Sequence, residues 1–87
     1  MEQVIDDRKR EIVEMRKRMG AAIKQLREDR NMSRKEAASL LNMSIPALYY
    51  IETGRHGLSL DRYTDFRRVF DIEPGALLEA AYATPHP

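Results

Sequence analysis

The middle of the chain carries three separate signals for the start of a helix, set close together. Ser33 and Glu36 have the spacing of a capping box, in which each side chain satisfies a free backbone N–H of the first helical turn. Ser44 is a second candidate N-cap, and Pro46 sits early enough in the helix behind it that its missing N–H costs little. Ser59 is a third. Starts this close together predict short helices joined by short turns.

Apolar residues recur at three- and four-residue spacing in these segments, and no alternating pattern typical of strands appears. The first short helix is expected to end at Asn42 and to bury Ala37, Ala38, Leu40 and Leu41. The second runs through Leu48 and Tyr50 or Ile51 to Gly54. The third carries the apolar stripe Leu60, Tyr63, Phe66, Val69 and Phe70. A last helix is predicted from Glu73 to about Tyr82, so the fold class is all-α.

The N-terminal third shows a seven-residue repeat formed by Ile5, Ile12, Met19 and Leu26. One helix over about residues 3 to 30 is predicted, although Gly20 costs roughly 1 kcal/mol relative to alanine and two helices meeting near Met19 are the alternative. Residues 1–18 are expected to be a helical extension, either solvated or forming a seam for a partner helix. Residues 19–82 then form the domain and 83–87 a flexible tail.

Composition excludes several classes of function. A chain of 87 residues makes one domain, and without cysteine it has neither disulfides nor thiolate metal ligands. His56 and His86 are the only histidines, so we expect no enzyme, metal, cofactor or small-molecule ligand. No signal peptide or membrane span is apparent, which predicts a cytoplasmic protein. The net charge is only +1, and residues 61–87 are acidic on balance, so this end is not expected to face phosphate.

Two short helices joined by a short turn meet the geometric needs of a helix-turn-helix. Ala37 and Ala38 would let the pair cross closely, so that the second helix protrudes from the surface. An ordinary helical hairpin has the same spacing, and this pattern alone leaves both possibilities open.

The span from Met19 to about Leu78 resembles the lambda repressor and Cro-like helix-turn-helix domain, also called the XRE family. The resemblance follows, in chain order, Gly20, Ile23 to Arg27, Ser33 to Ala38, Met43 and Ser44, Ile51 to Gly54, and Phe70 to Ile72. It implies a compact five-helix domain with the helix-turn-helix at 33–54 and a recognition helix at about 44–53. It also implies a structural ion pair between Arg27 and Glu52. The alternative is a surface ion pair that contributes little to stability.

The same resemblance places DNA contacts at Arg34, Ser44, Ile45, Pro46, Tyr49, Tyr50, Arg55 and His56. Many relatives have glutamine at the place of Arg34 and polar residues at those of Ile45 and Pro46, so base reading here would depend more on thymine methyl groups and DNA shape. Three of these residues have a structural alternative: Pro46 only starts the helix, Ile45 acts as a hydrophobic staple, and one tyrosine packs on the core. Helical spacing favours Tyr49 outward and Tyr50 at the flank. Arg55 and His56 would touch the sugar-phosphate backbone rather than bases, and a merely solvated loop is the alternative.

Together these expectations predict a sequence-specific regulator of transcription that binds a double-stranded DNA operator as a homodimer. Repression is the favoured mode of regulation. The dimer interface would be either the last helix or the N-terminal helix. The competing hypothesis is a protein-interaction adaptor or antitoxin-type module that keeps the fold but mainly binds another protein.

Overall fold

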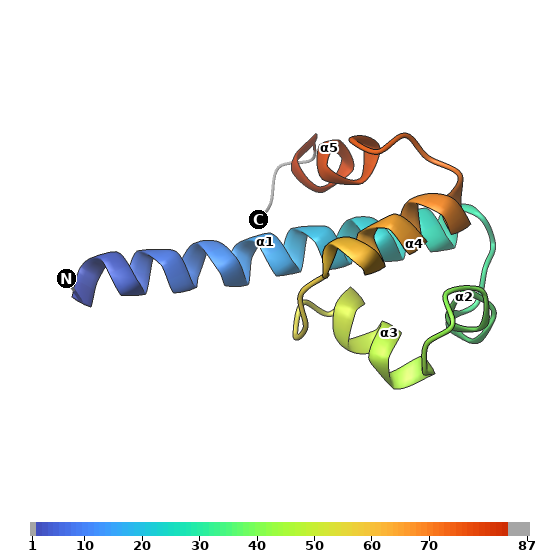
Figure 1. Cartoon of the computed structure of the whole chain (residues 1–87), viewed down its shortest axis with the longest axis horizontal. Helices are drawn as coiled ribbons and strands as arrows, with labels where there is room; N and C mark the ends of the chain where they lie inside the picture. Colours follow the sequence, from blue (N-terminus) through green and yellow to red (C-terminus); the bar gives the residue numbers. More distant parts are fainter. Residues whose placement is uncertain (1, 84–87) are drawn as a thin grey trace.

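The computed structural model describes residues 2–83 of the chain. Within this range it contains five helices and no strand: α1 (Glu2–Asp29), α2 (Arg34–Leu40), α3 (Ile45–Glu52), α4 (Leu60–Phe70) and α5 (Ala76–Ala83) (Figure 1). The all-α, five-helix prediction is confirmed. Of the expected tail, Ala83 is the last residue of α5, and 84–87 lie outside the described residues.

A single continuous helix, α1, forms the long axis of the molecule, so the one-helix prediction is correct and the break near Met19 is not found. Gly20 faces the end of α3. A Cβ atom at this position would lie 2.3 Å from the carbonyl oxygen of Ile51 and 2.7 Å from that of Glu52. Glycine is therefore required here for the close approach of two backbones, at the expense of helix propensity.

Local capping sets the starts of the three middle helices as the sequence predicts. The Ser33 Oγ accepts a hydrogen bond from the Glu36 N–H at 3.1 Å, and the Glu36 carboxylate accepts one from the Ser33 N–H at 3.2 Å. Ser44 and Ser59 each accept one backbone N–H in the same way, at 3.1 Å. Asn42 has a φ of 55°, the left-handed conformation expected after α2.

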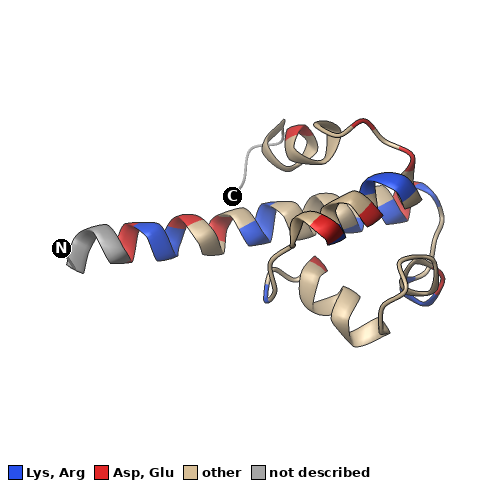
Figure 2. Ribbon diagram, viewed as in Figure 1, with Lys and Arg blue, Asp and Glu red and all other residues tan. Residues whose placement is uncertain are grey.

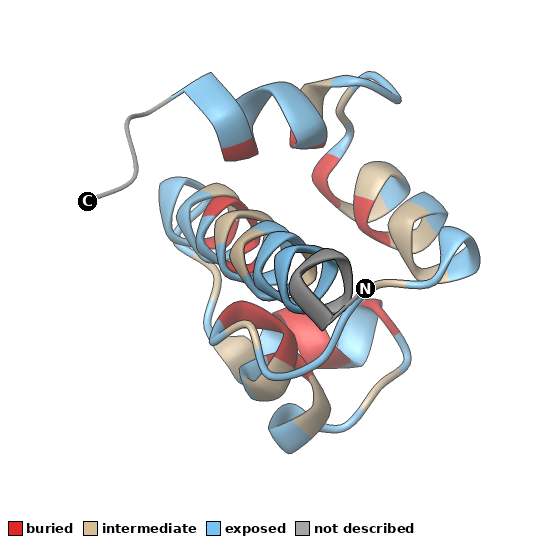
Figure 3. Ribbon diagram, turned by 90° about the vertical axis from the view of Figure 1, so that its left-hand side faces the viewer, coloured by how far each residue is buried: buried red, intermediate tan, exposed pale blue. Residues whose placement is uncertain are grey.

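The core lies between α1 and the helices that pack on it, which are α3, α4 and α5. Seen along α1, the buried residues face this shared interior (Figure 3). Its largest fully buried side chains are Phe66, Phe70, Ile23, Leu41, Leu48 and Leu77. Two arginines tie helix ends together: the Arg30 Nη2 donates to the Phe70 carbonyl and the Arg62 Nη1 to the Leu41 carbonyl, both at 2.8 Å.

Two predicted core residues are wrong, because Leu40 is 60% and Leu60 85% exposed. At about 100° per residue, Leu60 lies about 120° around the axis of α4 from Phe66, which points into the core. Leu40 lies about 160° around the axis of α2 from Ala38, which is buried. Both are apolar residues that lie off the buried faces of their helices.

The predicted start of the last helix at Glu73 is also wrong, because α5 begins at Ala76. Pro74 and Gly75 form a turn in which the Ala76 N–H donates to the Glu73 carbonyl at 3.0 Å. The Tyr63 hydroxyl holds this turn by donating to the Pro74 carbonyl. Over residues 2–83, none of the helices combines the length and apolar character needed to cross a membrane.

Candidate nucleic-acid interface

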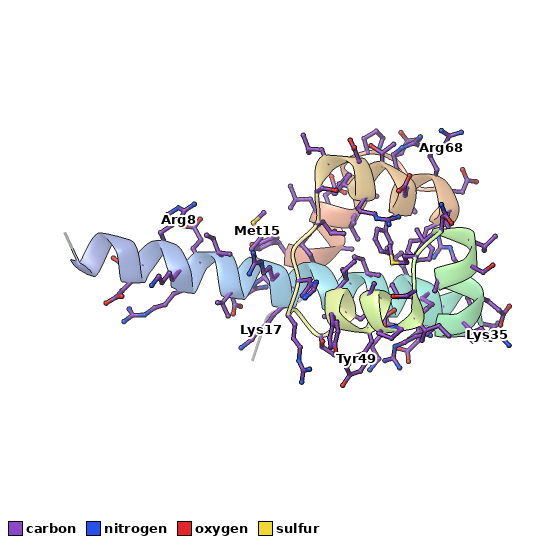
Figure 4. All side chains as sticks on the ribbon, turned by 60° about the horizontal axis from the view of Figure 1, so that its bottom comes forward. Arg8, Met15, Lys17, Lys35, Tyr49 and Arg68 are labelled. Carbon is purple, nitrogen blue, oxygen red and sulfur yellow. The ribbon has the colours of Figure 1, made fainter. Side chains whose placement is uncertain are left out.

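The helix α3 has one buried and one open face. Leu48 and Ile51 are buried against the domain, whereas Ile45 and Tyr49 are exposed and Tyr50 is half-buried at the flank. Periodicity predicted this orientation. Tyr49 projects from the edge of the molecule in Figure 4. Ser44 and Pro46 are exposed at the start of the helix, beside Ile45.

Five of the side chains expected to contact DNA form one continuous surface cluster, which we call the outer cluster. The rings of Tyr49 and Tyr50 lie 5.9 Å apart, and the ring of His56 lies 5.3 Å from that of Tyr50. The Arg55 guanidinium is 5.9 Å from the Tyr49 ring and 5.6 Å from the Tyr50 ring. The Arg34 guanidinium, from α2, is 5.1 Å from the Tyr49 ring. The cluster thus alternates aromatic faces with cations.

Backbone hydrogen bonds hold the loop behind α3 against the helix end. The Arg55 and His56 N–H groups both donate to the Tyr50 carbonyl, at 2.8 and 3.2 Å. Gly54 has a φ of +78°, and a Cβ atom there would lie 2.9 Å from the Lys17 Cα. This close passage along α1 keeps Arg55 and His56 beside the tyrosines.

Beneath the outer cluster, Glu52 joins three helices through two arginines. The Arg27 Nε and Nη2 donate to the two carboxylate oxygens of Glu52 at 2.7 and 3.1 Å, a bidentate pair between α1 and α3. The Arg34 Nε donates to the Oε1 of Glu52 at 2.9 Å. The side chain of Glu52 is 0% exposed and that of Arg27 is 8% exposed, so the pair is buried rather than superficial.

The second partner of Glu52 had not been expected, since the sequence assigned Arg34 only to DNA. Its Nε is engaged inside the protein, and the two Nη groups are not used by that hydrogen bond. The hydrogen bonds that Arg27 donates to the Glu52 carboxylate raise the pKa of Arg27 above its ordinary value, in spite of the opposing effect of burial. The Arg27 guanidinium therefore keeps its charge throughout the neutral range.

Two lysines not assigned by the sequence lie on the same side as the outer cluster. Figure 4 shows Lys17, Tyr49 and Lys35 along one edge of the molecule, with Arg68 at the opposite edge. The outer face of α3 itself carries no Lys or Arg, and the basic residues stand around it (Figure 2). The position of Lys17 follows from the close approach of Gly54, which spacing does not reveal. Among residues 2–83, no three acidic or histidine side chains gather as a metal site would require.

Comparison with known proteins identifies this arrangement. Residues 18–81 match the family described as a helix-turn-helix domain. The structure is similar to the crystal structure of the clp gene regulator ClgR from C. glutamicum, with a TM-score of 0.75 and 23% sequence identity over 79% of this chain and 90% of that one. No curated protein sequence matches the chain. The predicted resemblance is confirmed, and the chain belongs to the helix-turn-helix domain family.

Proposed function

We propose that the chain binds double-stranded DNA with α3 in the major groove and regulates transcription as a homodimer, repression being the simplest result of occupying a promoter. The observation that carries the proposal is the outer cluster, which combines an exposed helix face with cations on both sides. A major groove admits one α-helix, and the protruding face of α3 is the part of the domain suited to enter it. Membership in the helix-turn-helix family supports the same docking mode.

Base reading falls to Ile45 and Tyr49, the exposed large side chains of α3. The Ile45 side chain can pack on a thymine methyl group, and the Tyr49 hydroxyl can donate to or accept from a base edge. Neither makes the bidentate hydrogen bonds that discriminate bases most strongly. Specificity in this proposal therefore depends partly on the shape and deformability of the site.

Phosphate contacts fall to the cations around α3. Arg55 and the free edge of Arg34 flank the tyrosines, and Lys17 and Lys35 extend the same side in both directions. Because the net charge is only +1, attraction to DNA must come from this local arrangement. His56 and Tyr50 complete the contact at the flank, where they position the helix rather than read bases.

Selection of bound duplexes from a random library tests DNA binding directly. We expect an enriched palindromic sequence, because two copies related by two-fold symmetry read two equal half-sites. Failure to enrich any sequence would contradict the proposal. It would favour the alternative hypothesis of a protein-binding module. That alternative is relevant because α3 contains no Lys or Arg.

The selected duplex then allows a matched test of the docking face by fluorescence anisotropy. Tyr49→Ala should weaken binding by roughly fivefold or more, as expected when recognition of one base pair, typically worth about 1–3 kcal/mol, is lost. Leu40→Ala is the control, since it also truncates an exposed apolar side chain but lies outside the outer cluster. Equal affinities of the two variants would argue against α3 as the reading helix.

A further inference from the structure

An apolar groove of about 430 Å³ lies beside the outer cluster and shares only His56 with it. The protruding half of α1, the loop before α4, and the near ends of α4 and α5 border it. Its apolar walls include Ile12, Met15, Met19, Leu58, Leu60 and Leu78. Leu60 is 85% exposed, and Met15 and Leu78 are each more than 40% exposed. One exposed leucine needs no explanation, but several around one groove are typical of an interaction site.

The N-terminal half of α1 includes an arm, which we define as residues 6–18. Its first part extends beyond the rest of the domain (Figure 1), and its end lies against the domain, where Lys17 passes close to Gly54. Residues 6–11 are all exposed. A helical segment of this length gains little stability from its own hydrogen bonds in water, and tertiary packing normally stabilises such a segment. The arm carries Ile12 and Met15 on the face that borders the groove.

The charge balance of the arm is opposite to that of the C-terminal segment, which supplies Tyr63 and Leu78 to the groove. The arm has six basic and four acidic residues, which alternate along it in Figure 2. Residues 61–83 have three basic and five acidic residues. Two of the acidic ones adjoin apolar residues of the groove, Asp61 next to Leu60 and Glu79 next to Leu78.

We propose that the groove receives the arm of a second copy of this chain, giving a two-fold dimer in which the two arms lie antiparallel and each fills the other's groove. The proposal rests on the homodimer of the proposed function and names its interface. The α1 helix of each copy lines its own groove and also enters the groove of the other copy. The same residues therefore occur on both sides of the interface, as two-fold symmetry requires. His56 is the one member of the outer cluster that lines the groove. Arg34, Arg55 and the two tyrosines do not line it, so these DNA-contact residues of both copies stay accessible.

Sedimentation velocity of the full chain tests the interface. The wild type should be a dimer at micromolar concentration, and Met15→Glu and Leu60→Glu should each shift it to monomer by placing a charge in an apolar contact. Val13→Glu is the matched control, since Val13 is 46% exposed on the same arm but does not line the groove. Circular dichroism must show native helicity for each variant. A monomeric wild type, or groove variants that dimerise as well as the control, would overturn the proposal.

Cross-linking gives a second readout that does not depend on destabilising the dimer. The chain has no cysteine, so Met15→Cys and Leu60→Cys can be made as separate single-cysteine chains. After mixing, a short bis-maleimide should link the two kinds of chain, whereas a mixture of Val13→Cys and Leu40→Cys should remain unlinked. A dimer without the specific cross-link would refute this interface and leave the homodimer standing. Loss of operator binding in Tyr49→Ala with an intact dimer would concern only the DNA-binding face.

Discussion

Replacing Glu52 with alanine should lower the free energy of unfolding by about 3–5 kcal/mol, the usual cost of breaking a buried ion pair from one side. The carboxylate accepts two hydrogen bonds from Arg27 and one from Arg34, and it has no exposure to solvent. Its removal leaves the Arg27 guanidinium buried and charged, because the Nη1 bond to the Met32 carbonyl, at 2.8 Å, cannot neutralise it. The loss includes this uncompensated charge as well as the missing bonds.

The size of the domain makes this loss easy to detect. At about 0.05–0.15 kcal/mol per residue, a domain of this length has a total stability of roughly 4–13 kcal/mol. Each kcal/mol shifts the melting temperature of such a domain by about 4–8 °C. Glu52→Ala should therefore melt at least about 12 °C below the wild type.

Urea unfolding followed by circular dichroism, combined with a double-mutant cycle, separates the pair from simple truncation. Arg27→Met with Glu52→Leu removes both charges and fills the space with apolar groups, so the double variant should be more stable than Glu52→Ala. The coupling energy between the two positions should exceed about 1 kcal/mol. A loss below about 1 kcal/mol for Glu52→Ala would mean that the pair behaves like an exposed one and would refute the reasoning. The same conclusion would follow if the losses caused by Arg27→Met and by Glu52→Leu, each measured alone, added up to that of the double variant within about 0.5 kcal/mol.

Three further substitutions test other steps. Gly20→Ala should destabilise the domain by about 1–3 kcal/mol in spite of its better helix propensity, because its Cβ would meet the Ile51 carbonyl oxygen at 2.3 Å; a gain in stability in urea unfolding would disprove the close approach. Ser33→Ala should cost about 1 kcal/mol by the same assay through loss of the capping box, and no change would show the cap to be dispensable. Arg55→Ala should weaken operator and random DNA alike and reduce the slope of log affinity against log salt by about 0.9, one phosphate contact; a loss confined to one base pair would contradict its assignment to the backbone.

Features set by neighbouring residues could be predicted from the sequence. Ser33, Ser44 and Ser59 each start a helix because a serine cap acts on an N–H three residues away, which spacing alone determines. The outward direction of Tyr49 follows equally from helical periodicity. Its contact with DNA stays a prediction, since orientation limits which partners can be reached without selecting one.

Contacts between distant segments could not be predicted from local patterns. Arg34 and Glu52 are 18 residues apart, and only the packing of α2 on α3 brings them together. The requirement for Gly20 likewise arises from α3, so the sequence alone presents it as a defect in a helix. The ion pair between Arg27 and Glu52 could be predicted only from the family resemblance, because the resemblance implies how the helices pack on one another.

The wrong assignment of Leu60 to the core has a different cause, which bears on assembly. An apolar pattern indicates that a face avoids water, and it does not distinguish a face buried within one chain from a face buried between two. Phe66 and Phe70 are buried inside the domain, whereas Leu60 begins the same helix at the edge of the groove, opposite the arm. A leucine that is 85% exposed in the single chain is what a dimer interface would leave open. If Leu60→Glu stays dimeric and folds normally, that leucine has no role in assembly, and the sequence pattern that selected it signified nothing about packing.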